Sequence, residues 1–198
     1  MAIKLASIFF TMILVDNYVL AKFLGICPFL GVSKKLDSAV GMSLAVTFVM
    51  VMATAATWPL YMGILAPNGL EYLQTIVFIL DIAILVQLLE NFLKKFIPAL
   101  YKSLGVYLPL ITTNCTILGV TILNLDNGYS FPESIVCAAG AGIGFLVAMV
   151  LFSGVRRKVE QAIVPECFKG LPITLVAAAM TSLSFMGFGG IVEAIFGV

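Results

Sequence analysis

Long apolar stretches alternate with short polar segments along the whole chain. A transmembrane helix needs about 20 apolar residues to cross the hydrocarbon core of a bilayer. Six stretches reach that length, covering residues 4–32, 38–62, 71–93, 101–124, 133–155 and 171–195. The polar segments between them are too short to form a soluble domain. The pattern therefore predicts an all-α membrane protein with six transmembrane helices, in which residues 1–198 form a single integral membrane domain.

The composition agrees with this prediction and excludes several classes of function. Hydrophobic residues make up 62% of the chain and charged residues 11%, whereas soluble domains are typically about half apolar and about a quarter charged. The net charge is only +1 and no basic run alternates with aromatic residues, so we expect no nucleic-acid partner. The chain has no histidine, which excludes a haem or zinc site with histidine ligands from this chain alone.

The basic residues gather on one side of the predicted membrane. Cytoplasmic loops of membrane proteins are enriched in lysine and arginine. One side holds nine of these residues, namely Lys34, Lys35, Lys94, Lys95, Lys102, Arg156, Arg157, Lys158 and Lys169. Only Lys4 belongs to the other side. The asymmetry predicts a multi-pass protein in which the loops that carry these nine residues lie in the cytoplasm and both termini lie outside.

A six-residue pattern occurs twice, 88 residues apart. Cys27-x-x-Leu30-Gly31-Val32 in the first apolar stretch returns as Cys115-x-x-Leu118-Gly119-Val120 in the fourth. Each copy begins a group of three stretches, and because three is odd, the second group enters the membrane from the opposite side. We therefore predict inverted three-helix repeats over residues 1–97 and 98–198, a topology that often places a site at interrupted helices near the midplane. The alternative is chance recurrence in a chain rich in Leu, Gly and Val.

Helix-breaking residues accompany both copies of the pattern. Gly25 and Pro28 flank the first cysteine, and Pro109 and the TTN sequence precede the second. Proline removes a backbone donor and clashes with the preceding turn of a helix. We expect the first and fourth helices to be interrupted here, which membranes tolerate only where the backbone is buried in protein or lines a cavity. On a straight first helix, Cys27 would lie nearer the cytoplasmic side of the membrane than Cys115 does in the fourth helix. A break in the first helix would reduce this difference in depth.

Cys27 and Cys115 are the candidate metal ligands. Two thiolates facing each other in a low-dielectric interior are costly unless a metal neutralises them. Such soft ligands select copper(I), zinc or an iron–sulfur cluster. A 2Fe–2S cluster needs four ligands, so a second, similar chain would supply the other two. Cys137 and Cys167 are predicted to lie at opposite ends of the membrane and to serve as small packing residues.

Three segments resemble a known family. LVDNYVLAKFLGICPFLGVSKKLDSAVGM, LGVYLPLITTNCTILGV and GFLVAMVLFSGVRRKV are similar to the RnfA and NqrE family of membrane subunits, found in Rnf and Nqr ion-translocating oxidoreductases. The resemblance covers essentially the whole chain, and CPFLGVSKKL and LPLITTNC are its most specific parts.

The resemblance implies a function and a set of partners. It implies a six-span subunit paired with an inverted homologue of the RnfE type, and an intramembrane 2Fe–2S cluster with two cysteines from each partner. By motif, the ligands here would be Cys27 and Cys115. The complex, with further subunits of the RnfB, RnfC, RnfD and RnfG types, would move electrons between ferredoxin and NAD and couple this to transport of Na⁺ or H⁺. We expect no catalytic residue and no complete active site in this chain alone.

Polar residues inside the apolar stretches are further candidates, because such residues are often functional. The first stretch contains Asp16, Asn17 and Lys22, and the third contains Asp81, Gln87 and Glu90. Lys22 would either balance cluster charge or extend toward the cytoplasm. Asp81 would lie on an ion path or face a partner subunit. Glu90 is expected to pair with Lys94 at the membrane surface.

Two further segments are ambiguous. Thr112, Thr113 and Asn114 could donate hydrogen bonds to cluster sulfurs and tune the potential. GAGIG at 140–144 is predicted to be a helix-packing motif rather than a dinucleotide-binding loop, because no strand precedes it. Two functions compete with electron transfer, namely an inverted-repeat secondary transporter and a structural anchor without a metal.

Overall fold

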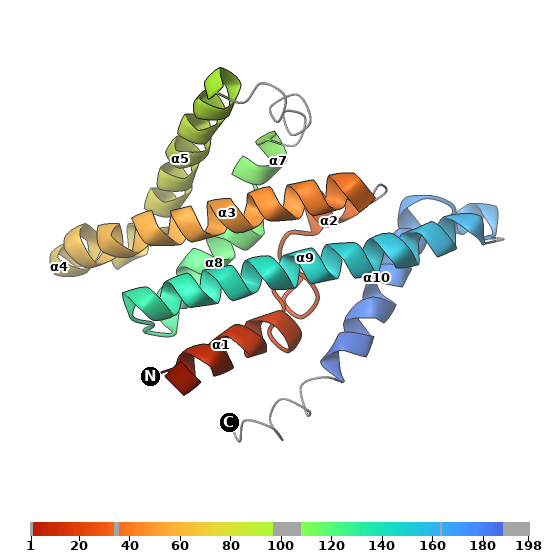
Figure 1. Cartoon of the computed structure of the whole chain (residues 1–198), viewed down its shortest axis with the longest axis horizontal. Helices are drawn as coiled ribbons and strands as arrows, with labels where there is room; N and C mark the ends of the chain where they lie inside the picture. The colour runs from red at the N-terminus through yellow and green to blue at the C-terminus, as the bar shows by residue number, and fades with distance from the viewer. Residues whose placement is uncertain (1, 34–35, 97–107, 163, 188–198) are drawn as a thin grey trace.

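The computed structural model describes residues 2–33, 36–96, 108–162 and 164–187, which contain helices and no strands (Figure 1). The helices are α1 (Ala2–Leu14), α2 (Ile26–Val32), α3 (Leu36–Leu60), α4 (Ala66–Asn68), α5 (Gln74–Phe96), α7 (Leu108–Thr112), α8 (Cys115–Asp126), α9 (Phe131–Gln161) and α10 (Leu171–Met186). A π-helical turn (Tyr61–Leu65) joins α3 to α4, and 3₁₀ turns (Glu71–Leu73 and Glu166–Phe168) precede α5 and α10.

The all-α prediction is confirmed for these residues, and three apolar helices are long enough to cross a membrane. They cover Leu36–Asn68, Gln74–Asn91 and Phe131–Gln161 and correspond to the second, third and fifth predicted stretches. The other stretches form shorter apolar helices, Lys4–Leu14, Leu110–Asp126 and Leu171–Met186. Parts of the fourth and sixth stretches lie outside the described residues, so the six-span arrangement stays a prediction.

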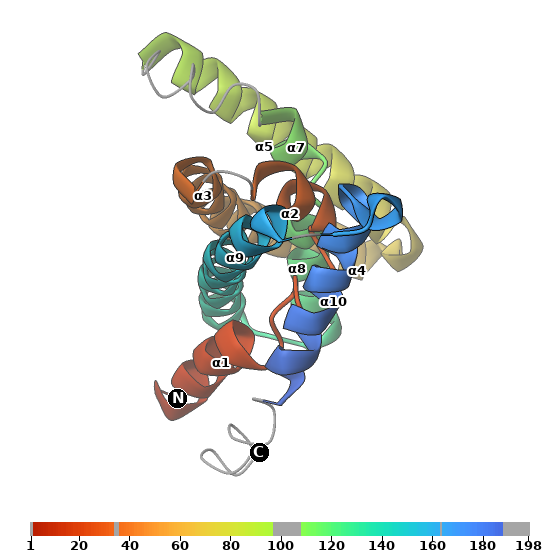
Figure 2. The same ribbon diagram turned by 90° about the vertical axis from the view of Figure 1, so that its right-hand side faces the viewer.

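Helix α9 is the central element of the fold. It packs against α3 along much of its length, against α1 over its N-terminal half, and also contacts α8 and α10 (Figure 1). Figure 1 shows α1 and α3 on opposite sides of α9, and in both views α5 lies beyond α3 (Figure 2). The buried side chains of α3 and α9 form the main core, including Met42, Val46, Met50, Phe145 and Met149.

The N-terminal end of α9 is fixed by local sequence and by α1. Ser130 and Glu133 form a capping box, in which the Ser130 N–H donates to the Glu133 carboxylate at 3.0 Å. The same carboxylate forms an ion pair with Lys4 of α1 at 2.8 Å. Trp58 of α3 donates from Nε1 to the carbonyl oxygen of Tyr129 at 3.2 Å. These contacts align the ends of α1, α3 and α9.

Glycines on α9 allow the neighbouring helices to approach closely. A Cβ atom added to Gly144 would lie 3.0 Å from the Met12 carbonyl oxygen, and one added to Gly140 would lie 3.1 Å from the Phe9 carbonyl oxygen. A Cβ at Gly142 would lie 2.5 Å from the side chain of Thr47 on α3. The packing prediction for GAGIG is therefore confirmed, with α1 on one face of this segment and α3 on another.

Substitution of Gly144 should separate α1 from α9. We expect Gly144→Ala to lower the free energy of unfolding by about 1–3 kcal/mol, because the added methyl group overpacks a backbone contact. Gly154 is a matched control on the same helix, since a Cβ there would have no atom within 4 Å. Gly154→Ala should leave stability unchanged or raise it slightly. Thermal unfolding of the purified complex measures both, and equal effects would contradict this packing arrangement.

Candidate metal centre at two broken helices

The first apolar stretch is interrupted between α1 and α2, where residues 15–25 form no helix. The side chain of Asn17 is buried and forms hydrogen bonds with backbone groups of this irregular segment. Its Nδ2 donates to the Gly144 carbonyl oxygen on α9 at 2.8 Å, and its Oδ1 accepts from the N–H groups of Val19 and Leu20. Irregular backbone at membrane depth needs such partners, because no bulk water is available there. Asn17 therefore has a structural role that its sequence position alone did not reveal.

The interruption ends in a left-handed turn. Phe23 and Gly25 have φ angles of 54° and 81°, and Gly25 directly precedes α2. A Cβ on Gly25 would lie 2.1 Å from the Thr116 hydroxyl oxygen, so no larger residue fits without displacing α8. Gly25 thus marks the break, as predicted. Pro28 lies in the first turn of α2, where its missing N–H needs no helical acceptor, and its ring would clash with a helical turn through Leu24, so it agrees with the predicted break.

The fourth apolar stretch is interrupted between α7 and α8, at Thr113 and Asn114. Asn114 is buried and caps α8, with its Oδ1 accepting from the Thr116 N–H at 3.0 Å. The TTN sequence therefore interrupts the helix as predicted. Pro109 lies in the first turn of α7, and the residues before this helix lie outside the described part of the chain, so its share in the interruption stays a prediction.

The two interruptions meet. The backbone N–H of Gly25 donates to Sγ of Cys115 at 2.9 Å, although the two residues are 90 positions apart. Leu24 fills the space above Gly119, where an added Cβ would lie 2.6 Å from the leucine side chain. Cys27 follows Gly25 by two residues, in the first turn of α2. That the break closes the difference in depth between Cys27 and Cys115 stays a prediction.

Both thiols at this junction are accessible. Cys27 lies in the first turn of α2 and Cys115 is the first residue of α8, and both side chains are exposed in the isolated chain. The sulfur of Cys115 already accepts a hydrogen bond from the Gly25 N–H. The nearby polar atoms Asn114 Nδ2 and Thr116 Oγ1 are buried without a hydrogen-bond partner among the described residues. The junction thus offers two soft ligands and donors that favour an anionic group.

Helix α9 holds α2 from the other side. The ring of Phe29 stacks on Phe152, with ring centroids 4.1 Å apart. Arg156 donates from Nη1 to the carbonyl oxygen of Leu30, near the end of α2, and to Ser33 Oγ at 2.8 Å. From the sequence, Arg156 counted only as a charge that indicates orientation. In the structure, it anchors the short helix that carries Cys27.

Comparisons with known proteins agree with the resemblance seen in the sequence. A family model described as "Rnf-Nqr subunit, membrane protein" matches residues 5–192. The chain belongs to the Rnf-Nqr family. It is 54% identical to a subunit of the ion-translocating oxidoreductase complex of Syntrophotalea carbinolica, over 91% of this chain and 93% of that protein. It is 53% identical to a subunit of the Na(+)-translocating ferredoxin:NAD(+) oxidoreductase complex of Acetobacterium woodii, over 94% and 97% of the two chains.

The other cysteines of this Rnf-Nqr protein lie elsewhere. Cys137 is buried in the core on α9, which confirms the prediction that it serves in packing. Cys167 lies in the turn before α10 and is exposed, so the packing prediction is wrong for this residue. Within the described ranges, no three cysteine, aspartate or glutamate side chains come together as a potential metal site.

The remaining polar candidates do not gather at the junction. Lys22 is exposed in the first interruption, and its Nζ lies 5.2 Å from the centre of the Tyr18 ring, a cation–π contact. Asp81 lies on α5, where its Oδ2 is buried without a hydrogen-bond partner in the described part of the chain. Gln87 is exposed on the same helix. The ion pair between Glu90 and Lys94 stays a prediction.

Among the glycines that the structure describes, Gly25 should be the least replaceable. We expect Gly25→Ala to destabilise the protein and to displace α8 from the Gly25 N–H, because the new Cβ would collide with Thr116. The cost should exceed that of a matched control by about 1–3 kcal/mol. That control is Gly69→Ala, since Gly69 also has a left-handed φ of 64° but has open space around it. Thermal unfolding of both variants measures the difference, and similar losses would contradict the close contact.

Proposed function

We propose that this chain is the RnfA-type membrane subunit of an ion-translocating ferredoxin:NAD oxidoreductase complex. In this role it relays electrons across the membrane through a 2Fe–2S cluster held jointly with a homologous partner chain. The observation that carries the proposal is the hydrogen bond from the Gly25 N–H to Cys115 Sγ, which joins the two interrupted helices that bear the exposed thiols. The names of the relatives from S. carbinolica and A. woodii support the assignment to such a complex.

The residues at the junction fit such a cluster. Cys27 and Cys115 would hold it, and two cysteines of an inverted partner of the RnfE type would complete the four ligands. When bound, the cluster would accept and release an electron. Gly25 would donate its N–H to a ligand sulfur, and the buried Nδ2 of Asn114 is available for a second hydrogen bond. Such hydrogen bonds raise the potential by stabilising the reduced, more negative state.

The surrounding chain would provide the membrane setting. We propose six spans arranged as inverted repeats, residues 1–97 and 98–198, in the prokaryotic cytoplasmic membrane with both termini outside. The exposed apolar side chains of α5, such as Ile76, Leu80, Ile84 and Leu88, would face lipid or neighbouring subunits. Further subunits of the RnfB, RnfC, RnfD and RnfG types would deliver and remove electrons, and the complex would couple their transfer to Na⁺ or H⁺ transport.

Removal of either ligand should abolish the cluster. In the purified complex, Cys27→Ser and Cys115→Ser should each remove the iron that belongs to this site and its electron paramagnetic resonance signal after reduction. They should also stop electron transfer from ferredoxin to NAD. Cys167→Ser is the matched control, because Cys167 is equally exposed but lies outside the junction. Unchanged iron and electron transfer in the Cys27 and Cys115 variants would refute the cluster and leave a metal-free transporter or anchor.

The orientation is testable in sealed membrane vesicles with variants that keep one exposed thiol, in a background in which the exposed Cys27 and Cys115 are replaced by serine. Cys167 lies in the loop predicted to be cytoplasmic, so in right-side-out vesicles it should react with a maleimide only when the reagent is membrane-permeant. Asn127→Cys in a Cys167→Ser background should react with the impermeant reagent as well, because exposed Asn127 follows α8 on the predicted outer side. The reverse labelling pattern would invert the proposed topology.

A further inference from the structure

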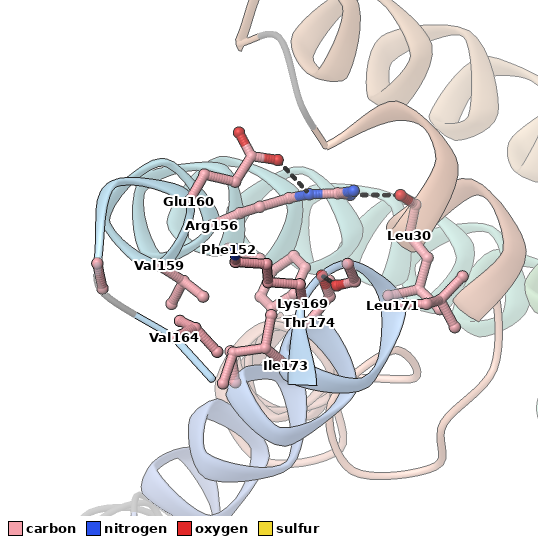
Figure 3. A pocket seen from close by; sticks show the side chains of 13 residues that line it. Leu30, Phe152, Arg156, Val159, Glu160, Val164, Lys169, Leu171, Ile173 and Thr174 are labelled. Carbon is pink, nitrogen blue, oxygen red and sulfur yellow. Dashed lines mark hydrogen bonds and ion pairs between the residues drawn. The ribbon is translucent and has the colours of Figure 1, made fainter. Parts of the chain in front are cut away.

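A cavity of about 370 Å³ opens between the last turns of α9, the beginning of α10 and the end of α2 (Figure 3). It lies at the end of α9 that the distribution of basic residues assigns to the cytoplasm. In Figure 3, Arg156 and Glu160 of α9 lie on one side of the cavity, and Val164 and Ile173 lie on the other. Neither electron transfer nor ion transport, as proposed above, uses this cavity.

Three features of the cavity favour an anion. Lys169 and Arg156 both line it. Its floor includes Gly170 and Leu171 at the start of α10, a 16-residue helix whose N-terminus has no side-chain cap. The backbone N–H groups of a helix N-terminus attract phosphate and similar groups, and in the first turn of α10 Leu171 and Ile173 offer such groups, whereas Pro172 has none.

The existing partners of the two cations leave capacity for a ligand. Lys169 Nζ lies 3.8 Å from Glu166, but both side chains are largely exposed, and such ion pairs are weak. Arg156 is mostly buried, and its Nε lies 3.4 Å from Glu160 without forming a hydrogen bond to any described residue. A phosphate group would add acceptors that the glutamates do not supply.

The walls of the cavity favour a ligand with an apolar part. Leu30, Phe152 and Val159 line it together with Ile173. At its rim, the exposed apolar side chains of Leu171 and Leu175 follow each other one turn apart along α10. A soluble phosphate compound would not use this apolar surface, whereas the acyl chain of a membrane lipid would lie along it.

We propose that this cavity binds an anionic phospholipid of the cytoplasmic leaflet. The phosphate lies between Lys169, Arg156 and the N-terminus of α10, and an acyl chain follows the apolar face of α10. Basic pockets between transmembrane helices are known to hold anionic headgroups. Because Arg156 also binds the end of α2, the lipid stabilises the contact of α9 with the helix that carries Cys27.

The proposal is tested with the purified complex in nanodiscs of phosphatidylcholine, with or without phosphatidylglycerol. Native mass spectrometry gives the retained phosphatidylglycerol, and thermal unfolding gives its stabilising effect. Lys169→Gln should weaken phosphatidylglycerol binding about fivefold, as expected for one basic residue near the membrane surface. Lys169→Arg should restore it. Lys158→Gln is the matched control, because Lys158 is an exposed cation on α9 that does not line the cavity.

Two further measurements decide between the possible ligands. Ile173→Trp fills the cavity without changing its charge and should reduce phosphatidylglycerol binding as Lys169→Gln does. Inorganic phosphate, added to nanodiscs of phosphatidylcholine alone, should not stabilise the complex. Stabilisation by phosphate equal to that by phosphatidylglycerol would overturn the proposal in favour of a soluble ligand. Equal retention of phosphatidylglycerol by the wild type, Lys169→Gln and Ile173→Trp would overturn it in favour of a cavity without a lipid.

Discussion

The rest of this structure depends on one constraint, which is that backbone N–H and C=O groups inside a membrane must find partners within the protein. Residues 15–25 leave the helical conformation. The side chain of Asn17 accepts hydrogen bonds from two backbone N–H groups of this segment and donates one to the Gly144 carbonyl oxygen of α9. The glycine also permits the close approach of α1 that this hydrogen bond requires. The break in the first apolar stretch is therefore held by specific hydrogen bonds, and it sets the position of α2, which carries Cys27.

The same break explains how two distant segments form one junction. Gly25, in a left-handed conformation, fits against Thr116 and directs its N–H at Cys115. On the opposite side, Phe152 and Arg156 fix α2 against α9. A helix of seven residues has little stability of its own. Its orientation thus comes from its contacts with α8 and α9. The residues next to each of the two exposed thiols are largely buried.

Part of this arrangement could be predicted from the sequence. The length of the apolar stretches predicted the long helices α3, α5 and α9, and the repeated cysteine pattern directed attention to the two interruptions. Pro28 indicated the end of the break rather than its centre, because it lies in the first turn of α2, directly after the non-helical residues 15–25. The roles of Asn17 and Arg156 could not be predicted, since their partners Gly144 and Leu30 lie more than a hundred residues away. No local pattern encodes such contacts, and only the folded backbone brings them together.

The exposure of Cys27 and Cys115 has a consequence for how such a protein is made. A newly inserted copy presents two soft, accessible sulfur atoms at one junction before any other chain covers them. Exposed thiols are susceptible to oxidation and to capture of adventitious copper or zinc. If the proposed partner chain covers them, a cell that produces this chain gains from synthesising that partner in equal amounts and at the same time. The geometry of a helix break thereby becomes a requirement on the timing and stoichiometry of gene expression.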